Sequence, residues 1–465
     1  MKTIGIIAEY NPFHNGHAYQ IEEIRKKTHA DFVVAAMSGD FVQRGAPAII
    51  DKYARTKMAL SHGADLVIEL PTLWATASAE HFAMAGVTLF DKMGCIDGIC
   101  FGAETDDLAM LTSLADILAH EPADYQKALA SYLKEGMAFP SARARALLTY
   151  LTMHQQTLNT NSAVDAYTKA FSLSEISSIL DAPNNILALE YLKAINRRHS
   201  HMTPYAIRRK GAGYHDTDLT MPNASATAIR KALSAPIPHP AMQELCTADT
   251  QHSVAEKKLA LLRDTMPDTS FDILASYLEE YASVEADDFS SILGYLLLSR
   301  SKEGFSDIAD CNADISNRLT KSLYSFRSFS QFCEWNKSKD ITYTRMSRIL
   351  THLLLGHTQD NYNATKQLDY IPYLRILGFR KNSSGLLKEL KQTATVPVIA
   401  KLADARSQLT PEAFSLLEKD IFAADLYEQI MQQKTSNTLL TSQVSLMLHK
   451  KTTPRSEYTR EIVRI

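Results

Sequence analysis

The first hundred residues alternate between short apolar runs and segments with helical periodicity, and this alternation limits the folds that the chain can adopt. The apolar runs span residues 3–8, 31–37, 65–70 and 96–101. Asp51 and Gly63 are residues suited to begin and end one of the helices between them. Strands that are apolar almost throughout are typical of a parallel sheet covered by helices on both faces. We therefore predict an α/β fold with a Rossmann-like parallel sheet.

The pattern changes further along the chain. Residues 106–180 are helical, which predicts a helical insertion, and residues 203–207 are strand-like again. Three prolines within residues 234–240, followed by a polar stretch, mark a boundary. The 465 residues suit two or three domains of ~150 residues. We expect a first domain over 1–235 and a mainly α-helical C-terminal domain over 236–465.

Composition excludes several classes of protein. The net charge of −3 argues against a chain that is basic throughout and coats nucleic acid. No apolar run approaches the roughly 18 residues of a membrane span, and the N-terminus lacks the features of a signal peptide. The five cysteines are odd in number and scattered, which predicts neither a disulfide framework nor a zinc site. We expect a reduced, cytoplasmic protein.

The segment from His14 to His17 (His-Asn-Gly-His) lies where the first strand ends and the first helix begins. A helix start offers backbone N–H groups and partial positive charge to a phosphate. Two histidines three residues apart share one helix face and can donate to phosphate oxygens as charge shifts at the α-phosphorus. Gly16 leaves room for a nucleotide. We predict an ATP site, with a chance pattern or a metal site as alternatives; no carboxylate or cysteine nearby has clear ligand spacing.

A second motif, residues 225–230 (Ser-Ala-Thr-Ala-Ile-Arg), opens a later helix. Its hydroxyl groups and Arg230 can hold the β- and γ-phosphates. The alternative is that Ser225 and Thr227 only cap the helix and that Arg230 is solvated.

These two motifs resemble those of the HxGH nucleotidylyltransferase superfamily, which is related to class I aminoacyl-tRNA synthetases, although Ser-Ala-Thr replaces the usual Ser-Ser-Thr. Additional segments in series are similar to the bacterial tRNA(Met) cytidine acetate ligase family, strongly over residues 1–235 and more weakly in the helical part. They are residues 37–45, 49–52, 64–71, 101–104 and 183–187.

The resemblance implies a ligase that activates acetate with ATP to acetyl-adenylate and pyrophosphate. It then transfers the acetyl group to N4 of the wobble cytidine (C34) of elongator tRNA(Met), which gives N4-acetylcytidine. Residues 1–235 would form the nucleotidylyltransferase-like catalytic domain and 236–465 the tRNA-binding domain. The expected partners are acetate and elongator tRNA(Met), with neither DNA nor a membrane. Mg²⁺ is expected with the triphosphate on general chemical grounds, although no residue marks a site for it.

By resemblance, the expected catalytic residues are His14, His17, Asp40 and Arg44. The residues expected to contact ATP are Ile7, Ala8, Glu9, Tyr10, Asn11, Pro12, Phe13, His14, Asn15, Gly16, His17, Ala18, Tyr19, Gln20, Gly102, Asn184, Asn185, Arg208, Arg209, Ser225, Thr227 and Arg230. Simpler roles remain open for some of them. Arg44 could form a surface salt bridge, the asparagines could cap a helix, and Gly102 could serve a turn.

The wobble base must leave its stack to reach the acetyl group, which a single-stranded loop permits. The expected RNA-contacting residues are Arg345, Arg348, Arg375, Arg380 and Lys381, with Tyr343, Tyr373 and Phe379 available to stack on bases. The alternative is that the arginines are solvated and the aromatic residues belong to the core.

Two other functions fit parts of the chain. One is a nucleotidylyltransferase that acts on a small phosphorylated metabolite, which would need no helical second half. The other is a catalytically silent RNA-binding protein, which would not need the intact histidine pair.

Overall fold

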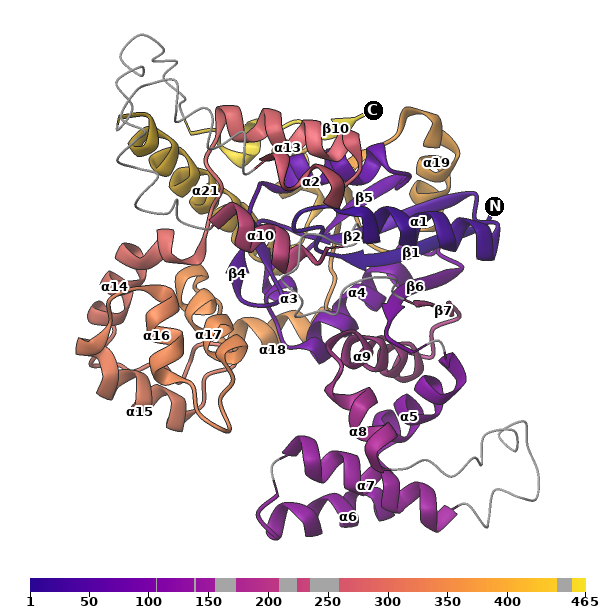
Figure 1. The fold of residues 1–465 in the computed structure, drawn as a ribbon. Coiled ribbons are helices and arrows are strands. Elements are labelled where there is room, and N and C mark those ends of the chain that lie inside the picture. Colours follow the sequence, from indigo (N-terminus) through magenta and orange to yellow (C-terminus); the bar gives the residue numbers. More distant parts are fainter. Residues whose placement is uncertain (106, 138, 155–172, 209–223, 235–258, 441–453) are drawn as a thin grey trace.

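A mostly parallel sheet forms the centre of the molecule (Figure 1). The computed structural model describes residues 1–105, 107–137, 139–154, 173–208, 224–234, 259–440 and 454–465. In this part of the chain the sheet has eight strands in the order β10-β8-β5-β2-β1-β6-β7, and β9 pairs with β8. The strands are β1 (Thr3–Ala8), β2 (Phe32–Ser38), β5 (Leu66–Leu70), β6 (Gly98–Ala103), β7 (Thr203–Arg208), β8 (Leu374–Phe379), β9 (Val398–Ile399) and β10 (Val463–Arg464). A separate hairpin consists of β3 (Phe41–Val42) and β4 (Ala46–Pro47).

The five strands β5, β2, β1, β6 and β7 run parallel to one another. In the register of this sheet, Ile6 of β1 pairs with Ala35 of β2 and with Cys100 of β6. The carboxyl ends of these strands therefore meet at one edge, where ligands of open parallel sheets bind. The predicted α/β fold with a parallel sheet is confirmed.

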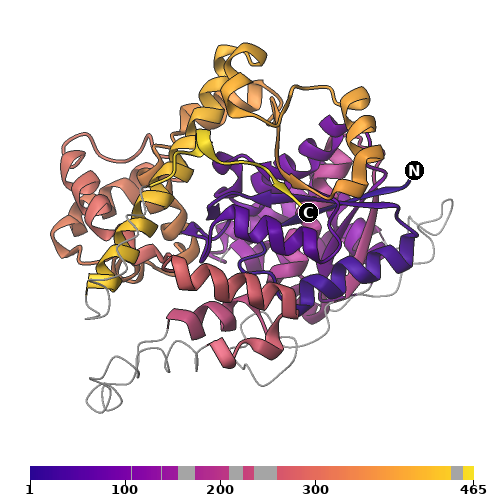
Figure 2. The ribbon, with the colours of Figure 1, turned by 90° about the horizontal axis from the view of Figure 1, so that it is seen from above.

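Helices cover both faces of the sheet, which explains why its strands are apolar almost throughout. Val34 and Ala36 of β2 belong to one core, and Val33 and Ala35 to the other. The first core also contains α4 (Ala79–Met93), α5 (Leu108–His120) and α9 (Pro183–Arg197). The second contains α1 (Asn15–Thr28), α2 (Lys52–Ser61) and α13 (Asp268–Glu280), which lie over the sheet in the view from above (Figure 2).

The expected helical insertion consists of α5, α6 (Ala123–Lys134), α7 (Phe139–His154) and α8 (Leu173–Asp181). It extends away from the sheet at the bottom of Figure 1, and α9 then returns to cover the sheet. The short α3 (Thr72–Ala75) follows β5, and α10 (Ala226–Ser234) begins the second motif.

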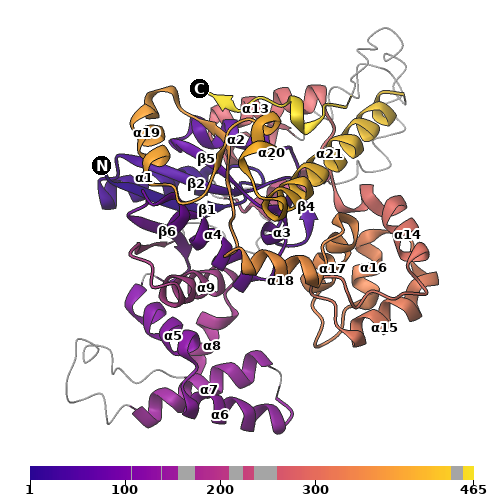
Figure 3. The same ribbon diagram turned by 180° about the vertical axis from the view of Figure 1, so that it is seen from behind.

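The C-terminal half is mainly helical, as predicted. A bundle consists of α14 (Ser290–Ser299), α15 (Ala313–Ser322), α16 (Phe329–Asn336) and α17 (Tyr343–Leu355), and α18 (Gln359–Gln367) leads away from it. The other helices, α19 (Ser384–Thr393), α20 (Ala405–Gln408) and the long α21 (Pro411–Leu440), are best seen from behind (Figure 3). None of the helices within the described residues is both long enough and apolar enough to span a membrane.

The sheet does not stop at residue 235, which differs from our expectation of separate halves. Strand β8 pairs antiparallel with β5, and β10 pairs parallel with β8. The apolar run Leu374–Phe379 carries the signal for β8, but its partner lies about 300 residues earlier. The division at residue 235 therefore stays a prediction about function.

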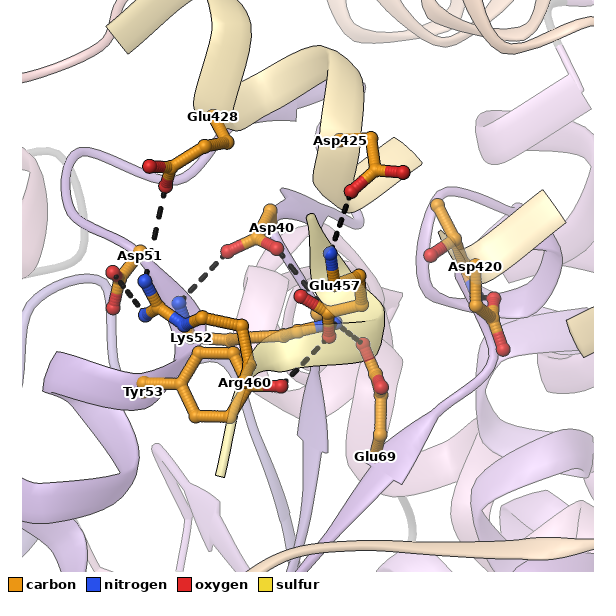
Figure 4. Close-up of polar contacts among 12 residues, drawn as sticks. Asp40, Asp51, Lys52, Tyr53, Glu69, Asp420, Asp425, Glu428, Glu457 and Arg460 are labelled. Atoms are coloured by element: carbon orange, nitrogen blue, oxygen red, sulfur yellow. Dashed lines mark hydrogen bonds and ion pairs between the residues drawn. The ribbon is translucent and has the colours of Figure 1, made fainter. Parts of the chain in front are cut away.

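A cluster of buried ion pairs joins the two halves (Figure 4). Lys52 Nζ lies 2.7 Å from Oε1 of Glu69 and 2.7 Å from Oε1 of Glu457. Arg375 Nη1 lies 2.9 Å from Oε2 of Glu69, and the guanidinium also pairs with Glu457. Burial opposes the charge of Glu457, but attraction to Lys52 and Arg375 outweighs it and lowers its pKa to about 2. Two cations and two carboxylates thus balance inside the protein.

The segment that carries Glu457 is fixed by further polar contacts. The Glu457 N–H donates to Oδ1 of Asp425 on α21 at 2.7 Å, and the Tyr53 hydroxyl donates to Glu457 Oε1 at 2.8 Å. Arg460 Nη2 lies 2.8 Å from Oδ2 of Asp51, the residue that caps α2. Residues 454–465 are therefore anchored to both halves.

We expect Glu457→Gln to lower the free energy of unfolding by about 3 kcal/mol, because it leaves buried cations without one of their acids. Since the pKa of Glu457 falls on folding, its contribution is present above about pH 4.5 and is lost as the pH falls toward 2. Urea denaturation measures the change. Glu461→Gln, on the exposed side of the same segment, is the control, and equal stability of the two variants would contradict the prediction.

Candidate nucleotide-binding site

A cavity of about 210 Å³ opens at the carboxyl ends of the parallel strands. It is lined by Ala8 at the end of β1, by Gly102 of β6 and Arg208 of β7, and by the first turns of α1 and α10. Asn184 of α9 completes one wall. The two sequence motifs, more than 200 residues apart, are thus brought to one cavity.

The two histidines cap the helix that follows β1. His14 Nδ1 accepts the N–H of Gly16 at 3.0 Å, and His17 Nδ1 accepts the N–H of His14 at 3.2 Å. Because both Nδ1 atoms accept, each neutral ring carries its hydrogen on Nε2. The rings are stacked, with centroids 3.8 Å apart. Both residues line the cavity, so the caps fix two imidazole N–H donors in one orientation.

Gly16 is required by this stacked pair. A Cβ atom at position 16 would lie 2.9 Å from Cε1 of the His14 ring, which is closer than two carbon atoms pack. The glycine between the histidines therefore serves the ring of His14 as well as access to the backbone.

The second motif begins α10 and reaches back to the first. Ser225 Oγ accepts the N–H of Ala228 at 3.1 Å, which is a helix cap. Arg230 Nη1 donates to the carbonyl of Asn11 at 2.7 Å, and its Nη2 donates to Thr227 Oγ1 at 3.2 Å. Ser225 therefore both caps α10 and lines the cavity.

A buried arginine holds the strand ends that frame the cavity. Arg55, with no exposed surface, donates to the carbonyls of Glu9 at 2.7 Å and Ser38 at 3.0 Å. The carboxylate of Glu9 in turn accepts the N–H of Gln43 at 2.9 Å. The ends of β1 and β2 are thus fixed relative to each other and to the loop that carries Arg44.

The two neighbouring asparagines have different places. Asn184 lines the cavity and donates to Oε1 of Glu104 at 3.0 Å. Asn185 is buried, and its Oδ1 accepts the N–H of Glu104 at 2.9 Å. Neither caps α9, whose N-cap is Ala182 without a side-chain hydrogen bond.

Comparison with known proteins agrees with this geometry. The HIGH nucleotidyl transferase family matches residues 1–442. The tRNA(Met) cytidine acetate ligase of Thermoanaerobacter sp. (strain X514) is 39% identical over 428 residues, which cover 92% of this chain and 95% of the relative. That of Acetivibrio thermocellus is 37% identical over 431 residues, or 92% of this chain and 94% of the relative. The chain belongs to the tRNA(Met) cytidine acetate ligase family.

A solved structure of the same overall fold supports this assignment. Thermotoga maritima TmcAL, bound with alpha-thio ATP, superposes with a TM-score of 0.81 at 27% identity, and the match covers 100% of this chain and 99% of that one. The ligand-free form of that protein gives 0.82 at 27% identity, with both chains fully covered. The resemblance inferred from the motifs is confirmed over the whole chain.

Most of the residues that we expected to contact ATP line the cavity, and so does Arg44, which we expected to act in catalysis. They are Ile7, Ala8, Glu9, Tyr10, Asn11, His14, Gly16, His17, Tyr19, Gln20, Arg44, Gly102, Asn184, Arg208, Ser225, Thr227 and Arg230. Five expected residues do not: Pro12, Phe13, Asn15, Ala18 and Asn185. Arg209 lies outside the described residues.

The apolar residues that line the nucleotide cavity were not predicted from the sequence. Phe82, Phe101, Leu187, Tyr191 and Ile207 also line the cavity. Phe101 and Ile207 directly precede Gly102 and Arg208, so their place at the strand ends was a usable signal. Phe82, Leu187 and Tyr191 lie on helices, where side-chain direction follows only from packing.

The prediction that Asp40 is a catalytic residue needs correction. It is buried and does not line the cavity. Its Oδ1 accepts the N–H of Lys52 at 2.7 Å, and its carboxylate lies 3.8 Å from Lys52 Nζ. Asp40 therefore lies beside the buried ion cluster and outside the cavity, because the chain turns inward between β2 and β3.

The residues that we expected to contact RNA lie in different surroundings. Arg375 is buried among Glu69 and Glu457, so the prediction that it contacts RNA is wrong. Arg348 Nε pairs with Asp310 at 2.9 Å, and Arg345 Nη2 donates to the Asp310 carbonyl at 3.3 Å. The RNA contacts of these two residues stay predictions.

Arg380 and Lys381 lie at the far end of the sheet. The Arg380 N–H donates to the carbonyl of Asp65, at the amino end of β5, and the Lys381 N–H donates to the carbonyl of Ile465. The cavity lies at the opposite, carboxyl ends of the strands, so any RNA contact at these residues, which stays a prediction, would be remote from it. Of the aromatic candidates, Tyr373 is a core residue.

The Asn184–Asn185 pair allows a matched test. We expect Asn184→Ala to raise the KM for ATP roughly tenfold, since a lost hydrogen bond to a charged group is worth ~1.5 kcal/mol, with little change in stability. Asn185→Ala leaves the N–H of Glu104 unpaired and should lower the free energy of unfolding by about 1–3 kcal/mol. Steady-state kinetics and urea denaturation of both variants check this, and the reverse pattern would contradict it.

Asp40 gives a pH-dependent prediction. Burial raises its pKa to about 7 against the attraction of Lys52 and Arg55. Because the folded-state pKa lies above the unfolded one, its contribution to stability is fully present below about pH 4 and is lost as the pH rises through 7. Between pH 4 and 8, the free energy of unfolding of Asp40→Asn should therefore fall by on the order of 1–4 kcal/mol less than that of the unmodified protein.

The free energy of unfolding of Asp40→Asn, measured at several values between pH 4 and 8, should vary less than that of the unmodified protein. Asp272→Asn, at an exposed position of α13, is the control and should keep the original slope. An unchanged slope in Asp40→Asn would show that Asp40 stays ionised throughout this range.

Proposed function

We propose that this protein activates acetate with ATP and transfers the acetyl group to N4 of the wobble cytidine (C34) of elongator tRNA(Met). The product is N4-acetylcytidine. The observation that carries the proposal is the pair of stacked histidines whose Nδ1 atoms cap α1 and which line a cavity at the strand ends. Membership of the ligase family, whose relatives carry this activity in their names, supports the choice of acetate and tRNA.

The first step forms acetyl-adenylate. An acetate oxygen attacks the α-phosphorus of ATP, the bond to the bridging oxygen breaks, and pyrophosphate leaves with its electron pair. The Nε2–H groups of His14 and His17 would stabilise the charge that develops on the α-phosphate oxygens. Arg230, which lines the cavity beside Asn11, is placed to bind the β- and γ-phosphates.

Arg44 is our candidate for binding acetate or the α-phosphate. It lines the cavity from the loop between β3 and β4, and a guanidinium binds carboxylate or phosphate oxygens with two parallel N–H groups. Two hydrogen bonds hold this loop in place. Arg55 donates to the Glu9 carbonyl, and the Glu9 carboxylate accepts the N–H of Gln43.

The second step transfers the acetyl group. The exocyclic N4 of cytidine attacks the carbonyl carbon of acetyl-adenylate, the bond to the phosphate oxygen breaks, and AMP and a proton are released. The base must leave its stack to enter the cavity, and the unpaired anticodon loop allows this. Phe82, Phe101 and Tyr191 in the wall give flat apolar surface for a base or for adenine.

A magnesium ion would bind chiefly through the triphosphate. The described residues include no group of three or more His, Cys, Asp or Glu side chains that could hold a metal. Mg²⁺ commonly keeps several waters and binds through substrate phosphates with one or two carboxylates, and Glu9 is a carboxylate in the cavity wall. We place the protein in the cytoplasm, with its tRNA substrate.

The experiment is incubation with labelled ATP and labelled acetate, with and without tRNA(Met). Pyrophosphate exchange into ATP should require acetate but not RNA, and acetylated tRNA should require both substrates. AMP release that does not depend on acetate would contradict the proposal and favour a different acceptor, such as a small phosphorylated metabolite. No turnover of ATP would favour a protein that only binds RNA.

We expect His17→Ala to reduce acetate-dependent pyrophosphate exchange by a factor of about 10²–10³, because it removes one donor to the transition state. The variant should bind tRNA(Met) as tightly as the unmodified protein. His201→Ala, an exposed position before β7, is the control and should keep full exchange. Loss of tRNA binding in His17→Ala would indicate a structural role for this ring.

A further inference from the structure

The helical bundle carries a second groove, which shares no lining residue with the nucleotide cavity. It lies between α15 and α16 and has a volume of about 750 Å³. Its lining includes Asn317, Arg318 and Lys321 of α15, and Trp335 and Lys337 at the end of α16. Sequence reasoning had singled out none of these residues.

Trp335 is exposed on the outer face of α16. Its side chain is 64% exposed, whereas Phe329, Phe332 and Cys333 of the same helix are buried. The helix thus meets the core with its apolar face and presents the indole to the groove. The other tryptophan of the chain, Trp74, is fully buried. A large exposed aromatic ring in a groove is a surface on which a nucleic-acid base stacks.

Three cationic side chains line the same groove as the indole. Arg318, Lys321 and Lys337 line the groove, against one lining carboxylate, Asp314. Arg318 is held in place because its Nη1 donates to the carbonyl of Asn336 at 2.6 Å. Lys337 pairs with Glu334 of α16, which is not among the lining residues. No ion pair of Lys321 occurs among the described residues. The groove is therefore positive although the whole chain has a net charge of −3.

This composition favours RNA over a protein partner. Lysine is depleted at the centre of protein–protein interfaces, whereas lysine and arginine neutralise phosphates in nucleic-acid sites. Tyr324, which is 92% exposed, lies between Ser322 and Ser325, two more residues of the lining. A second exposed aromatic residue thus lies next to lining residues of the groove along the chain.

The bundle is fixed to the loop that borders the nucleotide cavity. On α17, which packs against α16, Ser347 Oγ and Thr351 Oγ1 donate to the carbonyl of Gly45 at 2.6 and 2.8 Å. Gly45 follows Arg44, which lines the nucleotide cavity. Figures 1 and 3 show the bundle on the side toward which the parallel strands point their carboxyl ends. RNA in the groove would lie on the same side of the molecule as the cavity.

We propose that the groove between α15 and α16 binds a single-stranded segment of the tRNA substrate, with one base stacked on Trp335 and the adjoining phosphates held by Arg318 and Lys321. The identity of this RNA rests on the proposed function. The groove adds an RNA contact outside the cavity where the acetyl group is transferred.

The test measures the Kd of unmodified tRNA(Met) together with RNA-independent pyrophosphate exchange. Trp335→Ala should raise the Kd roughly 5- to 150-fold, the range for one lost base stack, and leave the exchange unchanged. Trp335→Phe should recover most of the affinity. Tyr295→Ala, 70% exposed on α14 and outside the groove lining, is the control and should bind tRNA normally.

Two further readouts report on the groove directly. Since Trp74 is buried, tRNA should quench the fluorescence of Trp335 in the unmodified protein, and Trp335→Phe should lose this quenching. Lys321→Ala should reduce the slope of log K against log salt by about 0.7, as expected for one phosphate contact on a single strand.

The outcomes separate the two proposals. An unchanged Kd in Trp335→Ala overturns the groove proposal, whatever the exchange assay shows. If the unmodified protein dimerises and Trp335→Ala does not, while both bind tRNA equally, the groove binds a second copy and the RNA proposal is wrong. Absence of acetate-dependent exchange in the unmodified protein overturns the proposed function, and the Kd series still decides the groove.

Discussion

The fold depends on the pairing of Lys52 and Arg375 with Glu69 and Glu457 in the interior. Charges removed from water are costly, and only close partners offset that cost. Here the partners come from α2, β5, β8 and the segment after α21. Because Glu457 pairs with both cations from a distant part of the chain, the cluster favours one arrangement of the two halves. The extra strands β8 and β10 extend the sheet beside this cluster.

The site depends on a smaller set of contacts that use backbone groups. The caps on α1 fix the tautomers and the stacking of His14 and His17, and Arg55 ties the carbonyl ends of β1 and β2. These donors are oriented before any substrate arrives, which is the condition for electrostatic stabilisation of a transition state. The ion cluster and the site are continuous, because Lys52 and Arg55 lie one turn apart on α2.

The sequence was sufficient for the parallel sheet and both motifs, because apolar strands and helix starts are local patterns. It also placed most of the cavity lining, since strand ends and helix starts of a parallel sheet must converge. It failed where direction depends on packing. Asp40 and Arg375 resemble surface residues in the sequence but turn inward, and Asn185 binds backbone while its neighbour faces the cavity. Trp335 carried no pattern that distinguishes an exposed ring from a buried one.

The distance along the chain between the partners of the ion cluster has a consequence for synthesis. Tyr53 and Glu457 are 404 residues apart, which corresponds to about 20–80 s of translation at ~5–20 residues per second. Throughout that interval the nascent polypeptide contains Lys52 and Glu69 but lacks Glu457, the other carboxylate that lies 2.7 Å from Lys52 Nζ. A prematurely terminated product would keep these charges unbalanced and its sheet edge open, and cellular proteases act on such locally unfolded chains. The cluster thus makes the full pairing of Lys52 and Arg375 depend on synthesis of the segment that carries Glu457.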